Sequence, residues 1–206
     1  MIFTPDPQKT ASRQNLSIRP DLAKSKNISQ WDFDGTGSWH IDGGKLVLSK
    51  AGVPAGPIRR PAALAILKMK PLLRSSIEAD ILSTAAPDVA RRDLDIIVGY
   101  ESPERFYYVH LSATSDDVHN GIFLVNNADR VRIDSGKSKP QLTDFSWHRV
   151  RVERDGQSGR IAVYLDGSTT PALLANDTTI THGRLGLGSF DDTGEFRNIV
   201  IAGSSD

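Results

Sequence analysis

WHRVRVERDGQSGRIAVYLDG, residues 147–167, decides the fold class of this chain. In its first half Val150 and Val152 alternate with charged residues, and in its second half Ile161 and Val163 occupy every second position. Successive side chains of a β-strand point to opposite faces, so this period of two predicts two strands that each bury one face. The turn residues DGQSG lie between the two halves. The stretch therefore predicts neighbouring strands joined by a tight turn.

The same alternation recurs in SSIEADIL (75–82), DLDIIVGY (93–100) and FYYVHL (106–111). Each run is expected to bury one face and to show the other to water or to a ligand. PAALAILKMKP (61–71) has residues of good helix propensity, but it is short and its neighbours read as strands, so we interpret it as a strand. Turn signals such as DGTG and LDGS separate the runs. Many short strands with almost no helix predict an all-β, two-sheet antiparallel β-sandwich.

The domain organisation follows from length and composition. A chain of 206 residues is a normal size for one domain, and all-β sandwiches of this length commonly have a single core. Residues 1–27 contain prolines among polar residues and have no sustained apolar periodicity, so we expect a loosely attached arm. Residues 28–206 make up the predicted sandwich domain.

Charge and composition exclude several classes of function. The formal charge is zero, from 25 basic and 25 acidic residues, which argues against nucleic acid and anionic membrane surfaces as partners. No apolar run approaches the roughly 20 residues that span a bilayer, so we expect no membrane insertion. Cysteine is absent, which excludes disulfides, thiolate zinc sites and cysteine nucleophiles. The first residues lack the basic and apolar regions of an intact secretory signal.

The C-terminal half resembles a known superfamily. Residues 147–167, followed by GRLGLGSFDDTGEFRNIVI (183–201), resemble the second half of concanavalin A-like lectin/glucanase domains, which include laminin G modules and the 3-keto-disaccharide hydrolase domain. In such domains a tryptophan strand, a strand ending in a DG turn, a GxxGLGS strand and a final FxNixi strand follow in this order, as they do here. The resemblance covers about residues 28–203.

This resemblance implies a jelly roll whose ligand, an oligo- or polysaccharide, lies across the concave sheet. It also implies extracellular or periplasmic work, with a leader absent from the sequence. The fold alone does not settle the function, because lectins, lyases, hydrolases and adhesion modules share it. Outward-pointing residues of the concave sheet are the candidate site residues. The oligomeric state stays open.

Glu78 and Asp80 form the first candidate site. Laminarinase-type glucanases of this fold carry Glu, an apolar residue, Asp, two apolar residues and a second catalytic Glu on one strand. Here EADILS matches at Glu78 and Asp80, but Ser83 stands where the second glutamate would be, and a retaining mechanism needs both carboxyl groups. The two carboxylates are therefore candidates for ligand binding, and the alternative is an ordinary polar strand face.

Tyr108 and His110 form the second candidate site, together with Arg130 and Arg132. The first two would lie on one strand face about 7 Å apart. The arginines alternate with the apolar residues of NADRVRI, so they are also expected to point away from the core. His119, in a nearby loop, is a further ligand-binding candidate. An alternative without a site is a surface cluster, because aromatic residues are favoured in strands for packing alone.

The second set also suggests chemistry. Polysaccharide lyases on jelly rolls use tyrosine and histidine to move the proton at the sugar C5 atom, while arginine neutralises the uronate carboxylate. The spacing of Tyr108 and His110 resembles alginate lyase-type sites, although the full motifs of that family are missing. Tyr108, His110 and Arg130 are therefore the catalytic candidates.

Clustered carboxylates suggest a metal. Asp191 and Asp192 in SFDDTGEF are the candidate ligands of a structural calcium ion, and Asp32 and Asp34 in WDFDGTG are the alternative pair. The alternative, turns without a metal, is the preferred interpretation of both motifs, since Asp and Gly favour turns.

Two functions follow from the sequence. In the first, the chain is a non-catalytic carbohydrate-binding or interaction module, which the missing second carboxylate favours. In the second, it is a glycan-active enzyme, a glycoside hydrolase or a polysaccharide lyase, that uses the Tyr108, His110 and Arg130 set. The sequence leaves open whether the protein is an enzyme.

Overall fold

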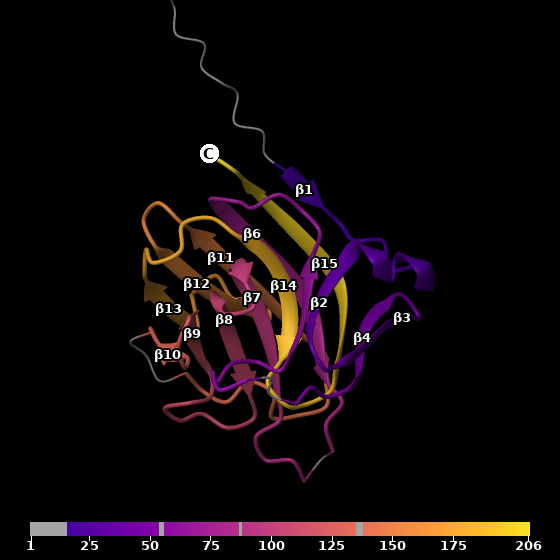
Figure 1. Ribbon diagram of the computed structural model, residues 1–206. Coiled ribbons are helices and arrows are strands. Elements are labelled where there is room, and N and C mark those ends of the chain that lie inside the picture. The colour runs from indigo at the N-terminus through magenta and orange to yellow at the C-terminus, as the bar shows by residue number, and fades with distance from the viewer. Residues whose placement is uncertain (1–15, 54–55, 87, 135–137) are drawn as a thin grey trace, which may run out of the picture.

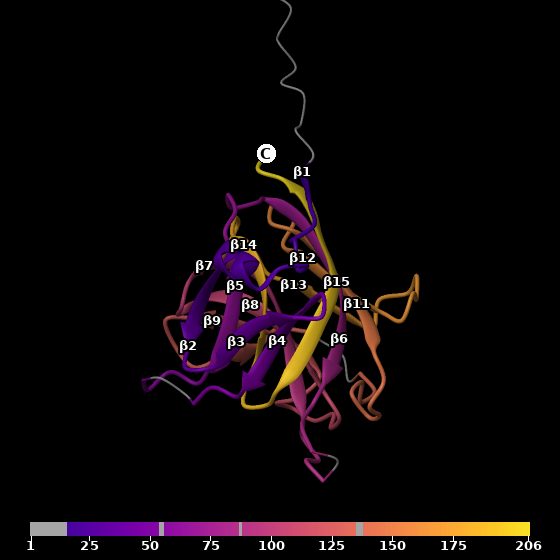
Figure 2. The same cartoon turned by 90° about the vertical axis from the view of Figure 1, so that its right-hand side faces the viewer.

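The strands of this protein form two sheets that pack face to face (Figure 1). The structure is a computed structural model and describes residues 16–53, 56–86, 88–134 and 138–206. Figure 2, turned by 90°, separates the two layers, with β2 and β5 on one side and β6 and β15 on the other. The predicted all-β antiparallel sandwich is therefore confirmed.

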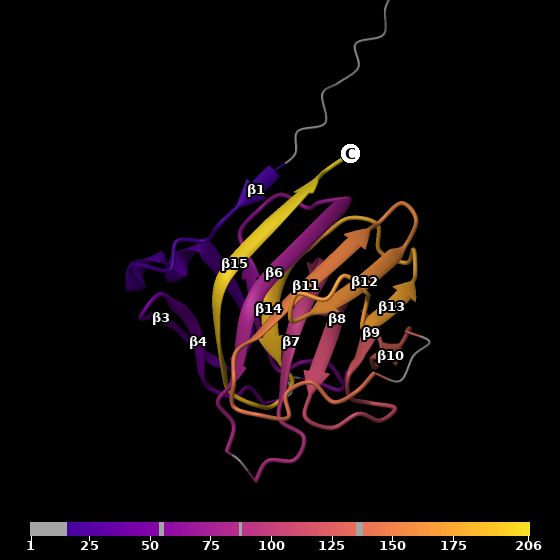
Figure 3. The same ribbon diagram turned by 180° about the vertical axis from the view of Figure 1, so that it is seen from behind.

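One sheet has eight strands, in the order β13-β12-β11-β6-β15-β4-β3, with β1 added to β15. Figure 3 shows this sheet toward the viewer. Its strands are β1 (Leu16–Ile18), β3 (Ser38–Asp42), β4 (Lys45–Lys50), β6 (Arg74–Ser83), β11 (His148–Asp155), β12 (Arg160–Leu165), β13 (Leu173–Asn176) and β15 (Gly194–Ser204).

The other sheet has seven strands, in the order β10-β9-β8-β7-β14-β5-β2. Its strands are β2 (Trp31–Gly35), β5 (Ala63–Leu67), β7 (Asp93–Ser102), β8 (Arg105–Ser112), β9 (Gly121–Asn126), β10 (Val131–Arg132) and β14 (Arg184–Ser189). The strand predicted within residues 61–71 is β5. Within the described residues the helical structure is one short 3₁₀ helix, η1 (Ser25–Gln30), and no helix there is long and apolar enough to cross a membrane.

The strands β11 and β12 form the hairpin that the alternating pattern predicts. Val152 pairs with Val163, and both side chains are buried between the sheets. Arg151 pairs with Tyr164 on the opposite face. At the turn, the Asp155 carboxylate accepts two main-chain N–H groups at 2.9 and 3.4 Å, which closes the tight connection.

Apolar side chains from both sheets fill the space between the layers. Phe196 of β15 and Tyr107 of β8 are among the largest fully buried side chains. The Tyr107 hydroxyl accepts the Ile180 N–H at 3.0 Å and donates to the Asp177 carboxylate at 2.5 Å. The polar atom that this tyrosine brings into the core is therefore satisfied.

The outer face of the seven-stranded sheet is buried as well. Ile58 packs on it. The carbonyl oxygen of the next residue, Arg59, accepts the Arg130 N–H at 3.0 Å, and the Arg59 N–H donates to the Asp129 carboxylate at 2.8 Å. Residues 56–60, the covering segment, therefore contact this face through Ile58. The apolar side chains beneath them form the outer-face cluster: Leu64, Ile66, Ile97, Tyr100, Phe106, Tyr108, Phe123 and Val125.

The expectation that each strand shows one face to water is wrong for β7 and β8. Every residue of β8 from Phe106 to Ser112 is buried, and β7 is buried from Asp93 to Tyr100. The inner faces of β7 and β8 pack against the other sheet. The apolar side chains of their outer faces belong to the outer-face cluster, on which Ile58 of the covering segment packs. An alternating pattern does not reveal whether other chain segments cover the second face.

Part of the predicted N-terminal arm is paired. Leu16 lies opposite Gly203 and Ile18 opposite Ile201, so β1 extends the eight-stranded sheet beside the C-terminal strand. Residues 1–15 of the predicted arm lie outside the described residues.

Candidate functional site

The structure separates the predicted site residues into two groups. Glu78 and Asp80 lie on β6 of the eight-stranded sheet, and their side chains point outward because Ile77, Ala79 and Ile81 are buried inward. The remaining candidates lie on or beside the outer face of the seven-stranded sheet. The two groups are on opposite outer faces of the sandwich, so one small ligand cannot contact both.

Tyr108, His110 and Arg130 do come together, as predicted. The ring centroids of Tyr108 and His110 are 6.3 Å apart, and Arg130 donates to the Tyr108 hydroxyl at 2.7 Å. The Arg130 guanidinium also lies over the rings of Phe123 and Phe190, at 4.7 and 4.4 Å from their centroids. However, Tyr108 and His110 are only 0% and 2% exposed. The predicted accessibility of these two side chains is therefore wrong, because the outer-face cluster encloses them.

Arg132 and His119 organise a loop. Arg132 forms an ion pair with Asp134 at 2.9 Å and donates to the main-chain oxygens of Asp116 and Asn120. His119 contacts the Asp116 carboxylate through Nδ1 at 2.7 Å. The expectation that the apolar residues beside the arginines face the core fails at Val131, which is 60% exposed.

Two aspartates that sequence reasoning did not single out lie next to His110. Asp95 of β7 is directly opposite His110 of β8, and the Asp93 carboxylate is 3.7 Å from His110 Nε2. One ligand atom from each of the three residues lies within 4.8 Å of the others. This group, the buried Asp-Asp-His cluster, is 0 to 2% exposed.

The polar atoms of the buried Asp-Asp-His cluster are incompletely paired. Among the described residues, neither carboxylate oxygen of Asp95 has a hydrogen-bond partner, and neither does His110 Nδ1. Burial raises the pKa values of Asp93 and Asp95 well above the usual range and lowers the pKa of His110 well below it. All three groups therefore favour their neutral forms when nothing else binds them.

A weak signal for the cluster exists in the sequence. Asp93 and Asp95 are two residues apart and opposite the apolar face of Leu94 and Ile96, which is where site carboxylates of a strand would lie. Their partner His110 lies on another strand, so only the register between β7 and β8 reveals the group.

Asp191 and Asp192, the predicted calcium ligands, lie near Asp93 in a second acidic group. The Asp93 carboxylate already accepts the Phe190 N–H at 2.7 Å, and Asp192 accepts the Asp93 N–H at 2.9 Å. These bonds tie the loop before β15 to the start of β7.

The alternative acidic pair is engaged in ion pairs with basic residues. Asp32 contacts Arg184 at 2.5 Å and Asp34 contacts Arg60 at 2.8 Å. Within the described residues, neither belongs to a group of ligand atoms close enough to share an ion.

The exposed carboxylates of β6 are part of a charged surface. Glu78 pairs with Arg149, while Asp80 lies 3.4 Å from Arg197 and accepts a hydrogen bond from Asn198 at 2.6 Å. Beside them, Arg151 lies over the ring of Tyr164 at 4.1 Å from its centroid. Positive charges, carboxylates and an aromatic ring therefore alternate over the outer face of β15, β6, β11 and β12.

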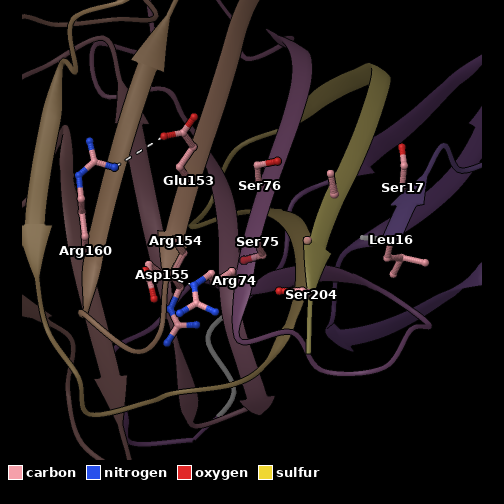
Figure 4. Close-up of a pocket in the computed structure, with 12 residues that line it drawn as sticks. Leu16, Ser17, Arg74, Ser75, Ser76, Glu153, Arg154, Asp155, Arg160 and Ser204 are labelled. Carbon is pink, nitrogen blue, oxygen red and sulfur yellow. Dashed lines mark ion pairs between the residues drawn. The ribbon is translucent and has the colours of Figure 1, made fainter. Parts of the chain in front are cut away.

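This face is hollowed. Three adjoining hollows of about 560, 350 and 230 Å³ share lining residues, among them Ser76, Glu78 and Arg151. We call them together the sheet depression. Figure 4 shows the largest hollow, where Glu153 and Arg160 point toward one another and form an ion pair at 3.6 Å. The depression is open to solvent and carries several charged side chains, in contrast to the covered face of the other sheet.

Comparisons with known proteins identify the fold. No protein-family model matches the sequence, and no curated protein matches it. A carbohydrate binding module, CBM66 from Bacillus subtilis, matches with a TM-score of 0.56 at 16% identity, covering 82% of this chain and 93% of that one. The potassium-bound Emp46p carbohydrate recognition domain matches with a TM-score of 0.59 at 11% identity, covering 92% and 97%.

A third match is a mutant of a GH43 protein, BlXynB from Bacillus licheniformis, with a TM-score of 0.60 at 12% identity, covering 90% of this chain and 39% of that one. At these identities the matches establish a common fold. This chain shares the jelly-roll β-sandwich fold of these proteins. The predicted concanavalin A-like fold is confirmed, and a shared fold does not determine the function.

Proposed function

We propose that this protein is a glycan-binding module and that the glycan lies in the sheet depression. The observation that carries this proposal is the placement of Arg151, Tyr164 and Glu78 side by side in an open hollow. A cation, a ring and a carboxylate offer donors, an apolar surface and acceptors to a hydroxyl-rich ligand. Such a combination of a ring with a few convergent polar groups is typical of ligand sites.

The covered face of the seven-stranded sheet supports the same choice. A sugar that contacted Tyr108 or His110 would first have to displace the covering segment and the ring of Phe190, which lies 6.1 Å from the His110 ring. In the sheet depression no such displacement is needed, since the Arg149 side chain is 52% exposed. Glu78 and Asp80 thus remain ligand-binding candidates, and the Tyr108 group does not bind the glycan directly in this proposal.

The shared fold adds support of a general kind. Two of the matching structures are called a carbohydrate binding module and a carbohydrate recognition domain. We also propose that the protein functions outside the cytoplasm and that its ligands are oligo- or polysaccharides.

Alanine substitutions in the depression provide the test. A glycan found by screening neutral and uronic-acid polysaccharides should bind Arg151→Ala and Tyr164→Ala about tenfold or more weakly, because each loses a charge-assisted bond or a ring contact. Binding is measured by titration calorimetry. Arg105→Ala is the matched control, since this arginine is also ion-paired but lies on β8. Unchanged affinity in both depression variants would overturn the proposed location.

The same polysaccharide screen also tests whether the protein is an enzyme. The grouping of Tyr108, His110 and Arg130 favours it, because general acid–base chemistry needs such groups within reach of one another. New reducing ends alone would indicate a hydrolase, and reducing ends with the ultraviolet absorbance of unsaturated products would indicate a lyase. Binding without either signal supports the module.

A structural calcium ion at Asp191 and Asp192 stays a prediction. The nearby Asp93 supports it, but the hydrogen bonds within the loop already engage Asp93 and Asp192. If calcium is bound, a calcium-selective chelator should lower the Tm by several degrees, because an ion that binds only the folded state stabilises it. An unchanged Tm after chelation removes the prediction.

A further inference from the structure

We propose that Asp93, Asp95 and His110 bind a divalent transition-metal ion, with Zn²⁺ as the best-fitting probe. This inference concerns the outer face of the seven-stranded sheet and goes beyond the proposed glycan site. The two strands β7 and β8 are paired, so the three side chains are presented by a rigid part of the sheet. Their ligand atoms lie within 4.8 Å of one another, and movements of about 1 Å would bring them to the roughly 2.0–2.2 Å that zinc requires.

The unpaired atoms point to a missing ligand. Asp95 is 0% exposed, and among the described residues neither of its oxygens has a hydrogen-bond donor. His110 Nδ1, in a side chain that is 2% exposed, also has no partner there. A buried polar group without a partner is costly, and a buried carboxylate without one is more so. A cation held by Asp95 and by one ring nitrogen of His110 would give the aspartate the partner that it lacks.

The charged surroundings do not replace such an ion. The positive charge of Arg130 acts on Asp95, but the guanidinium donates its hydrogen bonds to the Tyr108 hydroxyl and to the Val118 carbonyl oxygen. Asp191 and Asp192 add negative charge beside Asp93. Four carboxyl groups therefore gather near the start of β7, which favours a divalent ion.

The donor set selects the class of ion. Calcium and magnesium prefer oxygen ligands, and calcium takes six to eight of them. An imidazole nitrogen with two carboxylates suits zinc and other first-row divalent ions better, and three protein ligands leave a position for water. The rings of Phe123 and Phe190 lie 6.2 and 6.1 Å from that of His110, so the site is largely screened from solvent.

The test uses the tag-free full chain, freed of metal by a chelator and then given Zn²⁺, Mn²⁺ or Ca²⁺. At about a hundredfold excess over Kd, Zn²⁺ should raise the Tm by about 5 to 10 °C in a domain of this size. Titration calorimetry should give one ion per chain. If neither Zn²⁺ nor Mn²⁺ moves the Tm, the proposal is overturned. A response to Ca²⁺ alone overturns it as well and points to the Asp191 group.

Asp95→Asn separates a metal ligand from a merely structural aspartate. The amide keeps the shape but is a poor ligand, so the Zn²⁺ response should disappear. Without metal, this variant should melt no lower than the wild type, because it no longer buries an ionisable group without a partner. Asp80→Asn, on the exposed face of β6, is the matched control and should keep the full response. A full Zn²⁺ response in Asp95→Asn would contradict the assignment.

A spectroscopic measurement on the wild type does not depend on any variant folding. Co²⁺ added to the metal-free protein should develop the visible d–d absorption of a protein-bound ion, and Zn²⁺ should abolish it by competition. Absence of this absorption at saturating Co²⁺ would overturn the proposal. A glycan that still binds the metal-free protein leaves the proposed function intact whichever way this experiment ends.

Discussion

Replacing Phe106 by alanine should lower the free energy of unfolding by about 3 to 5 kcal/mol, the usual cost of removing a buried aromatic ring. Phe106 lies on the outer face of β8 and is 0% exposed. Its ring is 5.8 Å from that of Tyr100 and 6.1 Å from that of Tyr108, both members of the outer-face cluster. Because other members of the outer-face cluster, held on paired strands, pack around the ring, the cavity should not close readily.

Urea denaturation of the wild type and the variant measures this effect. Phe145→Ala is the matched control, since Phe145 is 53% exposed and the Arg92 guanidinium lies over its ring, 4.3 Å from the centroid. This control should lose less than about 1 kcal/mol. If Phe106→Ala loses no more than the control, the outer-face cluster is not a core, and a ligand could reach Tyr108 and His110 after all.

Replacing Phe196 by alanine should also lower the free energy of unfolding by about 3 to 5 kcal/mol, because its ring lies in the core between the two sheets. Phe196 lies on β15, opposite Ile81 of β6 on one side and Leu46 of β4 on the other. Its ring is 5.9 Å from that of Trp39. The side chain thus fills space at the centre of the eight-stranded sheet, where its neighbours are held by strand pairing on both sides.

Phe196→Leu is the internal comparison, because leucine refills part of the volume and should recover part of the loss. The same denaturation measurement applies, with the midpoint and the slope reported separately, since a changed slope would indicate a loss of two-state unfolding. A loss of less than about 1 kcal/mol in Phe196→Ala would mean that the two sheets do not pack at this position as described.

The two phenylalanine variants also separate structure from function. Phe106 and Phe196 belong to different apolar clusters, and neither lines the sheet depression. Glycan affinity of the folded fraction should therefore survive both substitutions, whereas the Arg151 variant should lose affinity at wild-type stability. This contrast tests whether the depression binds the glycan independently of the cores.

The register of β7 and β8 explains why the buried Asp-Asp-His cluster was not found from the sequence. Ser102 pairs with Arg105 at the hairpin end, and an unbroken register from there would place Asp95 opposite Ser112. An irregularity after Val98, next to Gly99 with φ of +63°, shifts the pairing so that Asp95 faces His110. Glycine adopts this left-handed conformation without strain, but no local sequence pattern predicts at which residue the pairing of β7 with β8 resumes.

The alternating pattern is sufficient to predict the fold class, the main strands and their inward faces. Val152 and Val163 are buried and Glu78 points outward as the period of two requires, because that period is a property of the extended backbone. The same reasoning grouped Tyr108 with His110, since both lie on one strand.

Which outer face is open depends on the packing of the whole chain. The covering segment packs on the seven-stranded sheet through Ile58, and the eight-stranded sheet carries the depression, although both show alternating strands in the sequence. Burial of an outer face depends on contacts with segments distant in the chain, such as that between Arg59 and Arg130. Alternation describes one strand at a time, so it cannot contain that information.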